Sequence, residues 1–125
     1  MEVDRINNLV LAYMGDAVYE QKIRERLIRK GLNKVQNLQQ EALSYVSAIN
    51  QAQSLKRLID DNLLTVDEID VIMRARNSKV RSKPKNVDIL TYKHASGLEA
   101  LVGYLYFKND NTRIDKIIDI IMGEI

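Results

Sequence analysis

The chain has 125 residues, of which 46% are hydrophobic and 29% are charged, and its formal net charge is +2. This length and composition indicate one folded domain and exclude disordered and fibrous classes. With no cysteine and one histidine, disulfides, thiol nucleophiles and multi-histidine zinc or iron sites are excluded, so any metal must have oxygen ligands. No run approaches the about 20 apolar residues of a membrane span, and residues 1–29 indicate an amphipathic helix rather than a signal peptide. We therefore expect a cytoplasmic protein.

The first half of the chain predicts two long helical stretches. Apolar residues recur at helical spacing from Ile6 to Leu27, and Gly31 then follows as a stop signal, so we expect a helix over residues 3–30. The same spacing continues over residues 35–62, where it leaves room for a break near the middle.

A third helix is predicted over residues 66–76. Thr65 and Glu68 have the spacing of a capping box directly ahead of apolar residues. In this first turn of the helix, we expect water to reach Glu68. Residues 77–87 lose the apolar pattern and include the only proline, Pro84, which predicts a loop.

Two more helices are expected after this loop. Helical spacing resumes over residues 92–107, and it continues after the polar residues 109–111 into a segment with isoleucine on nearly all sides. Such a helix is usually buried in a core or in a subunit interface. Since no strand alternation or repeat occurs, the sequence predicts one all-α domain over residues 1–125.

Basic charge is concentrated in one part of the chain. Between Arg74 and Lys93, seven lysines and arginines stand against one acid, Asp88, which gives +6, while the remaining residues carry 12 basic and 16 acidic groups, which gives −4. Clustered positive charge is typical of a protein that binds a phosphate backbone. A solvated helix face is the more common meaning of any single basic run.

Two acids stand at unusual positions. Asp16 follows Leu9 and Tyr13 at helical spacing and precedes Glu20, which places both acids in an apolar stripe that we expect to face the core. Glu99 lies in a second such stripe of small and apolar residues. Its members are Tyr92, Ala95, Ser96, Val102, Gly103 and Tyr106.

A desolvated carboxylate is costly unless it is protonated, paired with a cation or bound to a metal. Asp16 and Glu99 on separate helices could share one Mg²⁺, or Mn²⁺ in its place, because magnesium accepts one or two protein carboxylates and keeps several waters. The alternatives are an arginine from another helix for Asp16 and the i,i+4 partner Arg24 for Glu20.

Gly15 and Gly103 each cost their helices about 1 kcal/mol relative to alanine. We therefore expect each of them to mark a close approach of another backbone or of a ligand.

Two segments, LAYMGDAVYE at residues 11–20 and ASGLEALVGYLY at residues 95–106, resemble the catalytic-helix motifs of the ribonuclease III superfamily. Their order, separation and intervening basic loop resemble Mini-III ribonucleases, the short bacterial members that lack a double-stranded-RNA-binding domain. The resemblance covers nearly the whole chain. It implies an all-α magnesium-dependent endoribonuclease with Asp16 and Glu99 as catalytic metal-binding acids. It also implies a homodimer whose two sites each cut one strand of an RNA duplex, with precursor large-subunit ribosomal RNA as the family's substrate.

The chain departs from larger members of the superfamily at two acids. Ala12 stands where they have a glutamate, and Ser96 stands where they have a second acid. This leaves the number of bound ions open, and Glu20 and Ser96 could hold metal-bound waters. The alternative function is a catalytically weak or inactive helical dimer that binds structured RNA or a ribosomal protein during ribosome assembly.

The basic loop would replace the missing RNA-binding domain, because A-form RNA is recognised largely through its phosphates and 2′-hydroxyls. The candidate RNA-binding residues are Arg74, Arg76, Asn77, Lys79, Arg81, Lys83 and Lys85.

Overall fold

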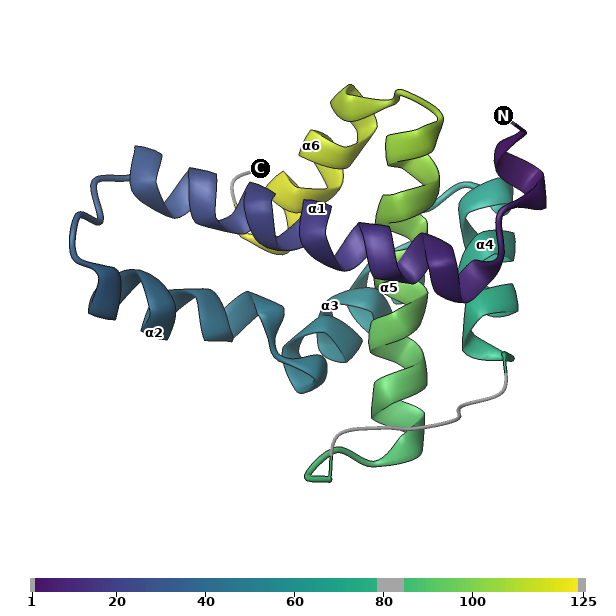
Figure 1. Cartoon of the computed structure of the whole chain (residues 1–125), viewed down its shortest axis with the longest axis horizontal. Coiled ribbons are helices and arrows are strands. Elements are labelled where there is room, and N and C mark those ends of the chain that lie inside the picture. The colour runs from purple at the N-terminus through teal and green to yellow at the C-terminus, as the bar shows by residue number, and fades with distance from the viewer. Residues whose placement is uncertain (1, 79–84, 124–125) are drawn as a thin grey trace.

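The computed structural model describes residues 2–78 and 85–123, and within these ranges its regular elements are all helical (Figure 1). They are a short 3₁₀ helix η1 (Val3–Arg5) and the helices α1 (Asn8–Arg29), α2 (Val35–Val46), α3 (Ala48–Asp60), α4 (Val66–Arg76), α5 (Ile89–Phe107) and α6 (Asn111–Ile121). The predicted all-α class is confirmed. None of the described helices is long and apolar enough to cross a membrane.

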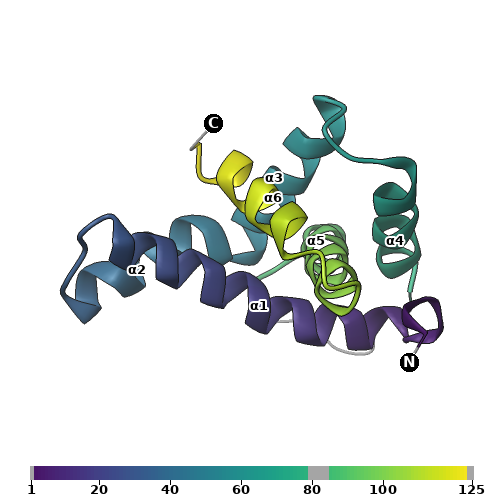
Figure 2. The same ribbon diagram turned by 90° about the horizontal axis from the view of Figure 1, so that it is seen from above.

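Helix α5 is the central element of the fold. Nine of its 19 residues are buried, because its sequence is apolar or small on nearly every side. Figure 2 shows α5 end-on, with α1, α3, α4 and α6 arranged around it. Each of these amphipathic helices therefore covers a different side of the same central helix.

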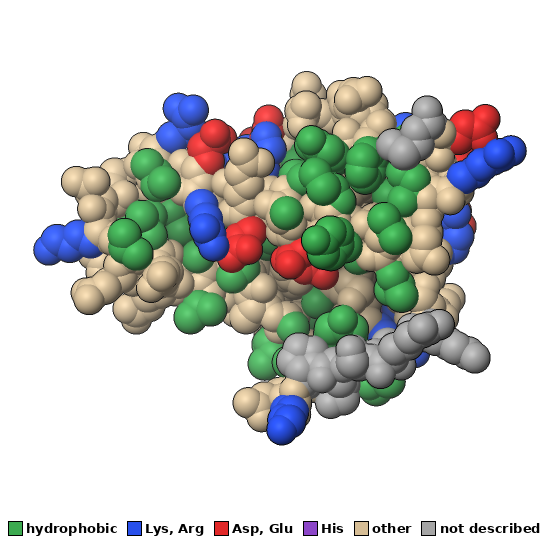
Figure 3. Space-filling view, in the orientation of Figure 1, with side chains coloured by type: hydrophobic (Ala, Val, Ile, Leu, Met, Phe, Trp, Pro, Cys, Tyr) green, Lys and Arg blue, Asp and Glu red, His purple; other side chains and the backbone are tan. Residues whose placement is uncertain are grey.

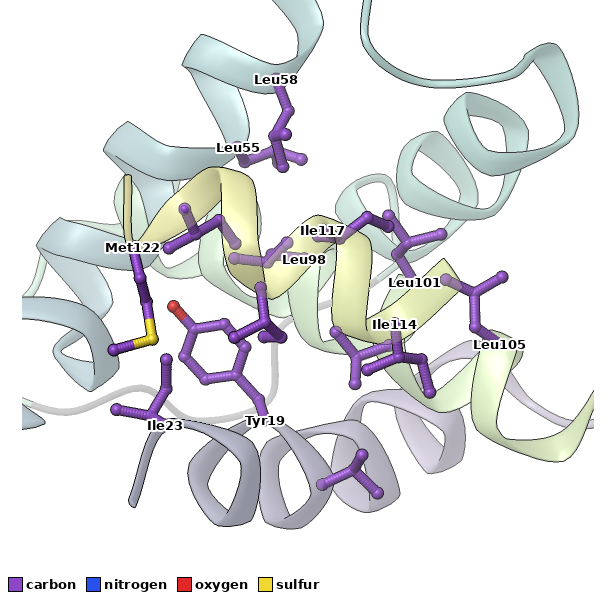
Figure 4. Close-up of a cluster of buried hydrophobic side chains, with 14 of the residues drawn as sticks. Tyr19, Ile23, Leu55, Leu58, Leu98, Leu101, Leu105, Ile114, Ile117 and Met122 are labelled. Atoms are coloured by element: carbon purple, nitrogen blue, oxygen red, sulfur yellow. The ribbon is translucent and has the colours of Figure 1, made fainter. Parts of the chain in front are cut away.

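The main core lies where α1, α3, α5 and α6 meet (Figure 4). Tyr19, Leu98, Ile114 and Ile118 are fully buried there. The Tyr19 hydroxyl donates a 2.8 Å hydrogen bond to the backbone oxygen of Tyr45, so this polar group is satisfied inside the core. The isoleucine-rich last helix is buried as expected, and it is buried in the core of its own chain.

Three caps set helix boundaries, of which the break in the stretch 35–62 agrees with the prediction and the starts of α1 and α5 differ from it. Asn7 caps the first turn of α1, so the predicted helix over residues 3–30 is divided after η1. Ser47 ends α2 and caps α3, which gives the stretch 35–62 its break. Asp88 caps α5, which begins three residues earlier than predicted.

Glu68 is buried, and the expectation that water reaches it is wrong. Its side chain completes the predicted capping box with Thr65, and both of its carboxylate oxygens accept 2.8 Å hydrogen bonds from Arg113 of α6. Burial alone would raise the pKa of Glu68, but the hydrogen bonds from Arg113 and Thr65 and the charge of Arg113 hold it below its usual value. The sequence gives no local sign of this partner, which is 45 residues away.

We expect Arg113→Leu to lower the free energy of unfolding by about 3–5 kcal/mol at about pH 7, because it leaves a buried carboxylate without its cation. The loss should shrink towards about pH 3. The depressed pKa of Glu68 stabilises the native state above the unfolded-state pKa of glutamate, and this contribution disappears as pH falls through the folded-state value.

Urea unfolding of both proteins at the two pH values measures this difference. Arg5→Leu is the control, since the Arg5–Glu2 pair is exposed on both sides and should contribute little. An equal loss at the two pH values would contradict the assigned role of Glu68.

Candidate active site

Helices α1 and α5 cross with their backbones almost in contact. A Cβ atom built on Gly15 would lie 1.6 Å from the backbone oxygen of Glu99, and one on Gly103 would lie 2.0 Å from the backbone oxygen of Leu11. Only glycine allows this approach, so the expectation for both glycines is confirmed, and the approaching group is backbone in each case. Because Asp16 directly follows Gly15, the crossing brings its carboxylate next to Glu99.

Asp16 and Glu99 lie close enough for their carboxyl groups to share a hydrogen bond. Burial raises the pKa of Glu99 to about 9, and the hydrogen bond and negative charge of Asp16 add to this rise. The charge of Glu20 acts in the same direction. Among the described residues there is no group of three histidine, cysteine or acidic side chains that could hold a metal, so the site is centred on two carboxylates.

The expected orientation of Asp16 is wrong. Asp16 is exposed, and Leu9 and Tyr13 of the same stripe are 45% and 83% exposed. The α1 residues that are buried instead are Leu11, Ala12, Gly15, Val18, Tyr19, Ile23 and Leu27. The start of α1 has apolar residues on two faces, and the face with small Ala12 and Gly15 can pack closest to α5.

The expected burial of the stripe around Glu99 on α5 agrees better with the structure than that of the Asp16 stripe. Glu99 is half-buried, and Ala95, Ser96, Val102 and Gly103 of its stripe are buried. Half of the candidate site therefore comes from the partly desolvated side of α5, and the other half comes from the exposed side of α1. Figure 3 shows acidic side chains near the middle of this face of the molecule, with hydrophobic side chains beside them.

The ion-pair alternatives have different outcomes for the two acids of α1. Glu20 pairs with Arg24 at 3.0 Å, as the i,i+4 spacing predicted. For Asp16, no lysine or arginine within the described ranges forms an ion pair. The exposed carboxylate of Asp16 is therefore not neutralised by a described cation.

Gln51 is a site residue that the sequence analysis missed. Its side chain is 2% exposed, and its Nε2 donates a 3.5 Å hydrogen bond to Oε2 of Glu99. This bond favours the ionised form of Glu99 and opposes the rise in its pKa. A signal was present, since Gln51 precedes buried Leu55 and Leu58 at helical spacing and is the polar member of that stripe.

The candidate RNA-binding residues lie at the end of α4 and in the segment between α4 and α5. Those within the described ranges are Arg74, Arg76, Asn77 and Lys85. The other three, Lys79, Arg81 and Lys83, lie outside the described residues. Arg74 forms an exposed 3.2 Å pair with Asp70, which a phosphate can replace at little cost.

Comparisons with known proteins show the family of this chain. Residues 9–110 match the model of the ribonuclease III domain. The chain belongs to the ribonuclease III family. It is an endoribonuclease of the ribonuclease III type.

Similar proteins cover nearly the full chain. The Mini-ribonuclease 3 of Streptococcus pneumoniae is 39% identical over 94% of this chain and 92% of its own length. That of Brevibacillus brevis is 46% identical over 90% of this chain and 82% of its own length. A protein of Fusobacterium nucleatum with a known crystal structure has 31% identity and a TM-score of 0.87, covering 98% of this chain and 99% of its own.

Ala12, which stands where the resemblance implies an acid in larger relatives, is buried in this structure. It is 7% exposed and belongs to a small apolar cluster between α1, α4 and α5. The buried members of this cluster are Leu11, Ala12, Val71, Ala75 and Ala100. A glutamate at position 12 would have to be buried among these side chains, at a large desolvation cost.

We expect Gly15→Ala and Gly103→Ala each to lower the free energy of unfolding by more than about 3 kcal/mol, because the new methyl group meets backbone atoms that cannot move aside. Gly97→Ala on α5 is the matched control. Its Cβ would lie 3.1 Å from a side-chain methyl of Ile72, which would have to shift by only a few tenths of an ångström. Thermal and urea unfolding of the three variants measures this, and a Gly15→Ala protein as stable as Gly97→Ala would contradict the tight crossing.

Proposed function

We propose that this chain is a magnesium-dependent endoribonuclease that cuts double-stranded RNA, with Asp16 and Glu99 as its catalytic metal-binding acids. The observation that carries the proposal is the pairing of these two carboxylates across the glycine crossing. The family supports the reaction class, and the similarity to Mini-ribonuclease 3 proteins supports this subclass.

The two acids fit a divalent cation. Two carboxylates in contact repel each other, and the raised pKa of Glu99 expresses this repulsion together with its burial. Magnesium would be held by oxygen atoms of Asp16 and Glu99, with Mn²⁺ as a substitute and waters completing its coordination. When bound, the metal would supply an activated water and stabilise charge on the leaving oxygen.

The two acids would have different roles in holding this site. Half-buried Glu99 accepts a hydrogen bond from buried Gln51. Asp16 is exposed, so its carboxylate would be accessible to a phosphodiester of the RNA. Glu20 and Ser96 are proposed to act only through waters. Glu20 already adds negative charge near Glu99, and Ser96 lies one helical turn before Glu99.

Contact with the RNA backbone is assigned to the segment between α4 and α5. The described residues Arg74, Arg76, Asn77 and Lys85 lie on its two sides, and Lys79, Arg81 and Lys83 belong to the same proposal. Lysine and arginine side chains suit a duplex that is recognised by phosphates and 2′-hydroxyls rather than by base edges. The proposed substrate is precursor large-subunit ribosomal RNA in the cytoplasm, with a ribosomal protein as a possible partner.

A second copy of the chain is proposed to cover the apolar surface beside the acids. Leu9, Val10 and Tyr13 are 45%, 52% and 83% exposed, although they precede Asp16 on the same helix. A separate groove of about 440 Å³ lies between α1 and α2 and is lined partly by Ile28 and Leu43. An exposed apolar surface of this kind is typical of an interface.

The nuclease reaction is tested with purified protein, a long RNA duplex and Mg²⁺. We expect Asp16→Asn and Glu99→Gln each to slow cleavage by more than about 100-fold, which corresponds to about 2.7 kcal/mol of transition-state stabilisation. Asp16→Asn removes a charge beside Glu99, and Glu99→Gln replaces a carboxyl group whose raised pKa keeps it protonated at neutral pH, so thermal stability should not fall in either variant.

Asp60→Asn and Glu41→Gln, which alter exposed acids on α3 and α2, are the matched controls and should cleave normally. Intact duplex with the unaltered protein would refute the proposed activity. Normal cleavage by both site variants would refute the assignment of the acids.

The dimer is tested by sedimentation at micromolar concentration. We expect Tyr13→Arg to give monomers, because a charged side chain would be buried in the proposed interface without a partner. Val66→Arg is the control, since Val66 is also 83% exposed but lies at the start of α4. A monomeric unaltered protein, or a dimer that persists in Tyr13→Arg, would overturn this interface.

A further inference from the structure

The start of α3 places a buried amide against the proposed metal site. Gln51, the fourth residue of α3, is 2% exposed, and its Nε2 donates to Oε2 of Glu99 at 3.5 Å. The next two buried positions on this face are Leu55 and Leu58, so this side of α3 packs against apolar surroundings. Packing alone would favour a third apolar side chain here, because a buried amide must keep a hydrogen-bond partner.

The corner between α2 and α3 fixes where this amide lies. Ser47 ends α2, and its side chain accepts from the backbone N–H of Asn50, while the Asn50 amide donates back to Ser47 Oγ at 2.7 Å. The hydroxyl of Tyr19 ties the same corner to α1 through its 2.8 Å bond to Tyr45. Tyr19 lies three residues after Asp16 on α1. The corner that presents Gln51 is therefore anchored to the helix that carries the other acid.

An amide suits this place better than a charged side chain would. A lysine or arginine would neutralise Glu99 and compete with a metal ion, whereas a third acid would add to the repulsion between Asp16 and Glu99. A neutral N–H donor orients one carboxylate oxygen and leaves the negative charge available. Hydrogen-bond partners of this kind commonly tune the affinity of metal-binding carboxylates.

We propose that Gln51 is a positioning residue of the metal site, which holds Oε2 of Glu99 so that the carboxylate keeps one orientation towards Asp16 and the ion. This inference rests on the proposed function, because it requires that Asp16 and Glu99 bind a divalent cation. Gln51 touches neither the ion nor the RNA in this role.

The test is Mn²⁺ binding, followed by electron paramagnetic resonance, in the full chain without RNA. Gln51→Met removes the N–H donor and keeps the length of the side chain. We expect it to weaken Mn²⁺ binding at least about tenfold. The Mg²⁺ concentration that half-saturates cleavage should rise by a similar factor, while cleavage at saturating Mg²⁺ recovers.

Leu55→Met is the matched control, because it introduces the same side chain one turn later on the same buried face, also at 2% exposure. It should bind Mn²⁺ like the unaltered protein. Gln51→Asn keeps the amide but is one methylene shorter, so it should also bind weakly. This second variant keeps the inference testable if Gln51→Met fails to fold.

The outcomes distinguish a failure of the role of Gln51 from a failure of the proposed metal site. Equal Mn²⁺ affinity in the unaltered protein, in Leu55→Met and in a folded Gln51 variant would overturn the role of Gln51 alone. Equal affinity in the unaltered protein and in Glu99→Gln would overturn the metal site itself, and the positioning role with it.

Discussion

The contact between Gly15 and Gly103 is the constraint on which the rest of the structure depends. Two helix backbones can approach this closely only where neither residue has a Cβ atom. The approach fixes where α1 crosses α5, and the side chains beside the crossing are then Asp16 and Glu99. The proximity of the two acids is a consequence of backbone packing, so the same contact serves both the fold and the candidate site.

Much of the fold could be predicted from local signals. Helical spacing gave the order of the helices, and the capping box at Thr65 gave the start of α4 correctly. The orientation of α1 could not be predicted in this way. Its first turns have apolar residues on two faces. Large side chains such as Tyr13 favour one face as the buried one, but the small residues Ala12 and Gly15 of the other face are buried. Which face of α1 is buried depends on how closely α5 can approach it. This distance depends on residues of both helices, so the sequence of α1 alone does not determine it.

In the candidate site, too, some residues could be identified from local sequence signals and others only from the packed structure. Asp16 and Glu99 could be identified as acids among apolar residues and by motif resemblance, although the stripe that contains Asp16 is exposed. Gln51 and Glu68 break patterns too, but each is explained only by a partner far along the chain. Gln51 bonds to a residue 48 positions away, and Glu68 to one 45 positions away. A single sequence does not reveal such partners, because pairings of this kind exist only after the helices have packed.

Helix α1 has three different surfaces, which pack against α5, carry the exposed acid and carry exposed apolar residues. This combination explains why its sequence is hard to interpret. One face has small residues that let α5 approach, and a second presents Asp16 to solvent. A third group, Leu9, Val10 and Tyr13, remains exposed in the single chain, and exposed apolar surface of this kind is typical of an interface. A second copy that covers these residues would lie beside Asp16, because Tyr13 precedes Asp16 by three residues on the same helix. The exposed tyrosine and the exposed acid are therefore best understood together, as parts of one surface that is complete only in the proposed dimer.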